Sequence, residues 1–138
     1  MASLIYNSCI DDLARNNIDF DTNTFKAMLV TSSYTPNKDT HDFRNDVTNE
    51  VSGTGYTAGG ATSAVTVTKD TANDKVTIQF GAVSWATSTI TARGCVYYKS
   101  TGGAASTDAL VAYNDFDSDV SSSGGTFSVA ASTITLQN

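Results

Sequence analysis

The sequence is poor in charge, in glutamate and in proline. Charged residues make up only 16% of its 138 residues, and fourteen acids against eight bases give a formal net charge of −6. The few bases are scattered and form no basic stripe that could bind phosphates, so we expect no direct nucleic-acid binding. Glu50 is the only glutamate. The other acids are aspartates, which favour turns and caps over helix interiors.

Long apolar runs and cysteines are also scarce. No run approaches the length of about 20 residues that a membrane helix needs, so we expect no membrane partner. The opening stretch Met1–Ala14 has no basic segment before an apolar one and does not resemble a secretory signal. Cys9 and Cys95 are too few for a disulfide framework. We expect two reduced, partly buried thiols in a protein made in a cytoplasm, and a bond between them is the alternative.

A single histidine, His41, limits the site chemistry that the chain can hold. A zinc site needs several His or Cys ligands, and both cysteines lie far from His41 in sequence. No nucleophile-elbow motif is present to support a Ser–His–Asp triad. We therefore predict that the protein is not an enzyme and needs no cofactor. Two aspartates placed for glycoside hydrolysis stay open as an alternative, but nothing in the sequence singles out a pair.

Two motifs have the spacing of known sites without their context. Gly53–Ala58 (GTGYTA) matches a dinucleotide fingerprint, but no strand precedes it and no helix follows it. We interpret it as a wide turn that Tyr56 holds in place.

Asp115–Asp119 (DFDSD) has calcium-loop spacing, but Val120 and Thr126 occupy the positions that need glycine and glutamate. We interpret it as an acidic turn, and a cation bound by its oxygens is the alternative.

The first half of the chain predicts one helix, one strand and a long loop. Apolar residues at helical spacing predict a short helix over residues 3–17, with Ser3 as its N-cap and Asn16–Asn17 as its stop. Thr24–Thr31 (TFKAMLVT) predicts a strand, and its continuous apolar run is typical of the middle of a sheet. A polar, glycine-containing loop follows over residues 32–60.

The second half has a period of two and predicts strands throughout. Ala64–Thr68 and Lys75–Phe80 predict a hairpin whose apolar residues share one face, with residues 82–85 continuing its second strand past Gly81. Further strands are expected over 89–99 (with a bulge at Gly94), 109–116, 126–130 and 133–136, with a turn at 121–125. The fold class is therefore mainly β: one domain over residues 1–138, an antiparallel β-sandwich or barrel-like domain of about seven to eight strands with one short N-terminal helix.

The loop over residues 32–60 is the first candidate for an interface. A loop of this length is uncommon in a compact domain and usually binds a partner or is ordered by one. The expected contacts are its aromatic, basic and proline side chains: Tyr34, Pro36, His41, Phe43, Arg44 and Tyr56. We expect the glycine-rich stretch Val47–Gly60 to direct residues 32–49 away from the sandwich.

Several stretches resemble a family of small structural proteins of tailed bacteriophages. The similarity covers Asp19–Tyr34, then TPNKDTHDFRNDVTNEVSGTGYTAGG, VTKDTANDKVTIQF and SWATSTITARGCVYYK. Its most specific parts are TNEVSGTGYTAGG and TITARGCVYYK. The family resembles the decoration, or cement, proteins of phage heads more than any enzyme. No catalytic motif of the family maps onto this chain.

The resemblance implies a virion structural protein on the capsid surface, made in the host cytoplasm. Its implied partners are the major capsid protein, which it would bind to stabilise the head, and further copies of itself in a homo-oligomer or symmetric particle. An acidic, polar surface suits a protein that stays soluble before assembly. Two alternatives stay open. One is a neck or tail component, and the other is a carbohydrate-binding module, for which Trp85 and Tyr98 are the only aromatic hint.

Overall fold

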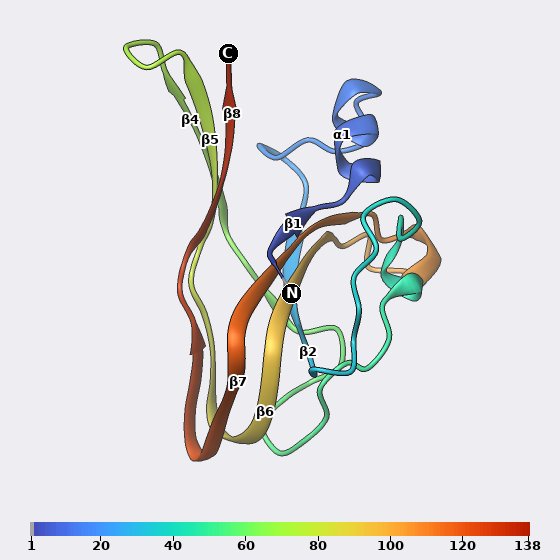
Figure 1. Ribbon diagram of the computed structural model, residues 1–138, viewed down its shortest axis with the longest axis vertical. Helices are drawn as coiled ribbons and strands as arrows, with labels where there is room; N and C mark the ends of the chain where they lie inside the picture. The colour runs from blue at the N-terminus through green and yellow to red at the C-terminus, as the bar shows by residue number, and fades with distance from the viewer. Residues whose placement is uncertain (1) are drawn as a thin grey trace.

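The computed structural model describes residues 2–138, which form two antiparallel sheets (Figure 1). One sheet has the strand order β1-β7-β6-β2-β3, and the other has the order β4-β5-β8. In chain order the elements are β1 (Leu4–Ile5), α1 (Asn7–Ala14), β2 (Phe25–Val30), the 3-10 turn η1 (Arg44–Asp46), β3 (Ala61–Thr62), β4 (Val65–Asp70), β5 (Lys75–Phe80), β6 (Val83–Lys99), the 3-10 turn η2 (Ala105–Thr107), β7 (Leu110–Val129) and β8 (Ser132–Gln137). The predicted mainly β fold, with eight strands and one short helix, is confirmed.

The five-stranded sheet is buried on both of its faces. Alternate residues of β2 explain why: Ala27 and Leu29 face the inner core between the two sheets, whereas Met28 and Val30 face the opposite way. The second set belongs to an outer cluster of buried residues, made of Tyr6, Met28, Val30, Tyr34, Val96, Tyr98, Leu110 and Tyr113. The continuous apolar run of β2 is therefore that of a strand covered on both sides, as its sequence predicts.

The hairpin of β6 and β7 joins the two layers. Figure 1 shows both strands turning at one end, so that the start of β6 runs in line with β5 and the end of β7 runs in line with β8. The register shifts between Trp85 and Ser88 at this bend, where Thr87 has a φ of 52° and Gly124 a φ of 67°. The predicted turn at 121–125 is therefore a bend inside one continuous strand, because its residues keep pairing with β6. The predicted bulge beside Gly94 is confirmed.

The N-terminal helix is shorter than predicted. Leu4 and Ile5 pair with Ala112 and Tyr113 of β7 as the strand β1, and the helix begins only at Asn7, with Tyr6 as its N-cap. Ser3 is therefore not the cap. Pairing with β7 satisfies backbone groups that a first helical turn would leave open, and this tertiary contact overrides the helical spacing. The predicted stop is confirmed, because Asn16 has a φ of 62°.

The hairpin of β4 and β5 has the predicted register. Val65 lies opposite Phe80 and Val67 opposite Ile78, so these side chains share one face. Ile78 and Phe80 are buried in the inner core, but Val67 is 41% exposed. The three-stranded sheet thus packs on the rest of the protein near Phe80 and extends past it toward residues 70–75.

We predict that Gly60→Ala will lower the free energy of unfolding by about 3 kcal/mol or more, because two effects add. Gly60 has a φ of +78°, and a Cβ there would overlap the carbonyl of Ala27. Gly102 is a matched control with a φ of +76° and nothing within 4 Å of a Cβ, so Gly102→Ala should cost only about 1 kcal/mol. Urea unfolding of both variants measures the difference. Equal losses would show that the contact with β2 does not matter.

Candidate interaction surface

The loop over residues 32–60 packs closely against the five-stranded sheet. Tyr34 and Val47 lie in the outer cluster, whereas Val51 and Tyr56 pack in the inner core. The loop is bound there by backbone hydrogen bonds from Asn7 N to Lys38 O (3.0 Å), from Leu110 N to Asp42 O (3.0 Å) and from Val51 N to Leu29 O (3.0 Å). The expectation that Val47–Gly60 directs the loop away from the sandwich is therefore wrong. The outer face of the sheet is apolar, and the loop supplies the residues that bury it.

Tyr34, which is buried, and His41, which is half-buried, form a polar cluster within the loop. The Tyr34 hydroxyl lies 2.8 Å from the Tyr6 hydroxyl and 2.9 Å from His41 Nδ1, and the two rings of Tyr34 and His41 stack. Asn37 N also donates to Nδ1 (3.3 Å), which makes Nδ1 an acceptor and places the imidazole proton on Nε2. Burial raises the pKa of both tyrosines, so both hydroxyls stay protonated. Tyr34 and His41 therefore hold the loop to the β1–α1 junction.

Arg44 forms an ion pair that holds the middle of the loop. Its Nε donates to Asp108 Oδ2 at 2.7 Å, and its guanidinium carbon lies 5.2 Å from the centre of the Tyr98 ring. Asp108 Oδ1 accepts hydrogen bonds from the backbone N and the hydroxyl of Thr101 (2.9 and 2.8 Å). Burial alone would raise the pKa of Asp108, but the Thr101 N–H and the Arg44 guanidinium outweigh burial and lower that pKa.

Tyr56 and Glu50 fasten the glycine-rich end of the loop. The Tyr56 hydroxyl donates to Glu50 Oε1 (2.8 Å) and accepts from Leu29 N (3.0 Å), and Gly59 N donates to the same carboxylate oxygen (2.6 Å). Burial and the nearby Glu50 carboxylate raise the pKa of Tyr56. The sequence interpretation of Tyr56 as the residue that holds this turn agrees with these contacts.

The six side chains predicted to contact a partner thus occupy different positions. Tyr34 is 2% exposed and Pro36 is buried, while His41, Arg44 and Tyr56 are half-buried and bonded within the chain. Phe43 alone is a large exposed apolar side chain, at 40%. The loop is therefore a pre-ordered surface on which Phe43 is the apolar contact residue.

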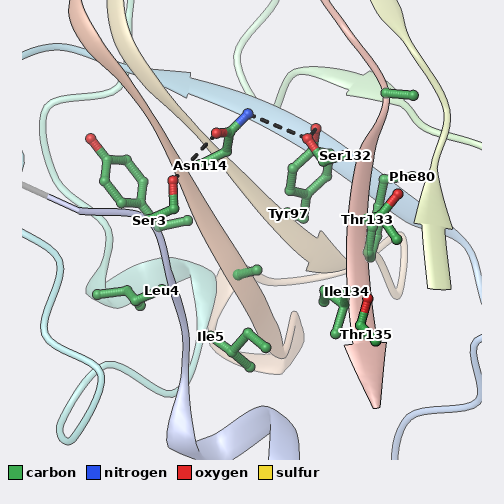
Figure 2. A pocket seen from close by; sticks show the side chains of 13 residues that line it. Ser3, Leu4, Ile5, Phe80, Tyr97, Asn114, Ser132, Thr133, Ile134 and Thr135 are labelled. Atoms are coloured by element: carbon green, nitrogen blue, oxygen red, sulfur yellow. Dashed lines mark hydrogen bonds between the residues drawn. The ribbon is translucent and has the colours of Figure 1, made fainter. Parts of the chain in front are cut away.

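A cleft of about 650 Å³ lies between β1 and β8 (Figure 2). Figure 2 shows Ile5 of β1 and Ile134 of β8 on its two sides. At one end of the cleft, Ser3 Oγ donates to Asn114 Oδ1 (3.4 Å) and Asn114 Nδ2 donates to Ser132 Oγ (3.3 Å), which links β1, β7 and β8. None of the residues lining the cleft is charged. Such a lining suits apolar and neutral hydrogen-bonding groups.

A second, shallower groove of about 400 Å³ continues along the inner face of the three-stranded sheet. It lies between the α1 side of the protein, including Leu13 and Phe20, and the strands β4, β5 and β8. Val67 and Leu136 line it and are 41% and 46% exposed. They are the apolar residues of the sheet that no other part of the described chain covers.

The other candidate sites from the sequence have structural roles. Within residues 2–138, no group of three or more His, Cys, Asp or Glu side chains is placed to hold a metal ion. Asp115 accepts hydrogen bonds from Arg93 Nε (3.2 Å) and Asp117 N (2.9 Å) at a wide bulge of β7. Trp85 and Tyr98 are 7% and 1% exposed, so they form no aromatic platform for a sugar.

The two cysteines are free and buried, as expected for reduced thiols. Burial raises the pKa of both Cys9 and Cys95 to about 12. Such thiols stay protonated and unreactive at neutral pH, so neither is suited to act as a nucleophile.

Comparison with known proteins gives no match: no family model, no curated protein and no solved structure matches the chain. No helix in the described part of the chain is long and apolar enough to cross a membrane. Sequence reasoning did not find the cleft, because its lining combines residues 3–5 at the start of the chain with residues of β5, β6, β7 and β8, which meet only in the folded protein. The one usable signal was the last strand, STITLQ, which alternates in polarity without any charge.

We predict that Asp108→Asn will lower the free energy of unfolding by about 1–3 kcal/mol at pH 7, because a buried charged hydrogen-bond partner of Arg44 is lost. The pKa of Asp108 is lowered in the folded protein, so its contribution is present above the ordinary carboxyl pKa and is lost as the pH falls through the lowered value. The difference between wild type and variant should therefore be constant from pH 7 to pH 5 and shrink as the pH falls below the ordinary carboxyl pKa. Denaturant unfolding at pH 7, 5 and 3 measures it. Asp119→Asn, at an exposed position, is the control, and a pH-independent difference would contradict the assignment.

Proposed function

We propose that this chain is a structural protein of a tailed-bacteriophage particle, a decoration protein that binds the major capsid protein and stabilises the head. Its sequence resemblance to phage virion proteins supports the proposal, and so does the nature of its surfaces. The large cleft has no charged lining residue, and the polar clusters of the loop are used to hold the fold together. These features suit a protein that works by binding.

The observation that carries the proposal is the pre-ordered loop with Phe43 at its surface. A flexible loop would lose conformational entropy on binding, which weakens affinity. This loop is already held by the hydrogen bonds of Tyr34, Arg44 and Tyr56 and by its backbone bonds to β2 and β7. A rigid apolar side chain surrounded by polar groups is the usual centre of a protein–protein contact. The loop is therefore the surface we assign to the capsid protein.

Copy number in purified particles tests the assignment to the head. A decoration protein occurs at a number comparable with the major capsid protein, because it follows the symmetry of the shell. A neck or tail component occurs in a single ring or in a few copies. Quantitative mass spectrometry of the particles, together with imaging, measures this. A copy number far below that of the major capsid protein would overturn the decoration role and favour the neck or tail.

We predict that Phe43→Asp will weaken binding to particles that lack this protein by about 30-fold or more, because a central apolar contact becomes a charge. Val120→Asp is the matched control, since Val120 is 42% exposed and pairs with Ala92 in the middle of β7, whereas Phe43 pairs with Ala109 just before β7 begins. Co-sedimentation of each purified variant with particles measures the affinity. Unchanged thermal unfolding of both variants shows that the fold is intact. Equal binding by the two variants would remove the loop as the contact surface.

A further inference from the structure

Strand β8 has one open side along its whole length. It is the last strand of the three-stranded sheet, and its register with β5 is regular from Lys75↔Gln137 to Phe80↔Ser132. Asn138 N donates to Asp74 O, which fixes the even-numbered residues of β8 as the ones that exchange hydrogen bonds with β5. The backbone N–H and C=O groups of Thr133, Thr135 and Gln137 therefore point to the open side, where the described chain supplies no strand.

The open side of β8 lacks the devices that normally protect a sheet edge. Free edges are usually short, bulged or charged, because a regular edge pairs readily with another strand. The other edges of this protein have those devices: β1 and β3 have two residues each, β4 carries Lys69 and Asp70, and β7 is bulged. β8 (STITLQ) has six residues without charge, proline or bulge. Its inward side chain Leu136 is also 46% exposed.

Space for one more strand exists beside β8. The five-stranded sheet ends in β1. The cleft lies between this edge and β8, and it is lined by residues 3–5, at β1, and residues 131–135, at the start of β8 (Figure 2). A strand added beside β8 would lie over Leu4 and Ile5, which are half-buried. It would meet only uncharged residues of the cleft.

We propose that the occupant is β8 of a second copy of this chain, paired antiparallel about a two-fold axis at Thr135. In this register Thr135 lies opposite Thr135 of the other copy and Thr133 lies opposite Gln137, so three odd-numbered pairs form about six hydrogen bonds between the copies. The same register places Ile134 of each copy opposite Leu136 of the other on the inner face. The exposed Leu136 side chains are then covered by apolar groups.

A second copy fits this edge better than a charged segment of another protein. Each chain has a net charge of −6, so two copies repel, but β8 itself carries no charge that would oppose its partner. The residue pattern of β8 is also self-complementary. In the two-fold pair, each Ile134 lies opposite a Leu136, and each N–H on the open side donates to a carbonyl of the other copy. This two-fold pairing is independent of the proposed virion role, and it would continue the sheet as β4-β5-β8-β8-β5-β4 across two copies.

Sedimentation velocity of the purified full chain tests the pairing. We expect a species of about twice the 14.5 kDa chain mass, which dissociates on dilution.

Thr135→Pro removes an N–H that points to the open side and is not used by β5, so the monomer should fold while the dissociation constant rises at least 100-fold. Lys69→Pro is the matched control at the opposite edge of the same sheet, and it should leave the dimer unchanged. Thr135→Lys, which places two like charges across the axis, should separate the copies as Thr135→Pro does.

Amide hydrogen exchange identifies the strand that pairs. In the dimer, the amides of Thr133, Thr135 and Gln137 should be protected, and this protection should fall as the protein is diluted. Circular dichroism of the variants checks that they fold. A chain that stays monomeric up to about 1 mM, a dimer that survives both Thr135 variants, or unprotected odd-numbered amides in a dimer would each overturn the proposal. Dimerisation through β8 in a protein that fails to bind phage particles would leave this proposal standing and remove the proposed function instead.

Discussion

The outer face of the five-stranded sheet must be kept from water, and most of the structure follows from this requirement. Met28, Val30, Val96 and Tyr98 lie on that face and are at most 2% exposed. The second sheet covers only the inner face, so the segment between β2 and β3 has to cover the other. A long segment over an apolar surface needs partners for its own polar groups. The clusters around Tyr34, Arg44 and Tyr56 supply them, which is why residues suited to an interface are used inside the chain.

The sequence predicted those parts of the fold that depend on neighbouring residues. Period-two alternation identified the β4–β5 hairpin and its shared face, and the continuous apolar run of β2 identified a strand buried on both sides. Asn16 ends the helix because asparagine tolerates a positive φ, which is a property of one residue. Predictions failed where a distant strand decided the outcome. Leu4 and Ile5 have helical spacing but pair with β7, and Ser121–Gly125 has a turn composition but pairs with β6.

The candidate contact residues also show what depends on neighbouring residues and what depends on distant parts of the chain. Sequence composition located the loop correctly but could not distinguish a residue that faces solvent from one that faces the sheet. Tyr34 and Phe43 are both aromatic residues in a polar context, yet the first is buried under the loop and the second is exposed. The difference depends on Tyr6 and His41, which meet Tyr34 only in the folded chain. The cleft between β1 and β8 could not be predicted from local pattern, because residues from both ends of the chain line it.

The three-stranded sheet is joined to the rest of the chain at one end only. Its links are residues 63–64 before β4, 81–82 after β5 and 130–131 before β8, and all three lie at the end where Phe80 is buried. The opposite end, about 20 Å away along the strands, has no further covalent link to the five-stranded sheet, and the partly exposed Leu136 lies near it, opposite Val76. The three-stranded sheet is therefore attached at the Phe80 end and free at the Lys75 end. The amplitude of thermal motion should therefore increase along β5 from Phe80 to Lys75. A partner that binds the free end would reduce the motion of the whole sheet.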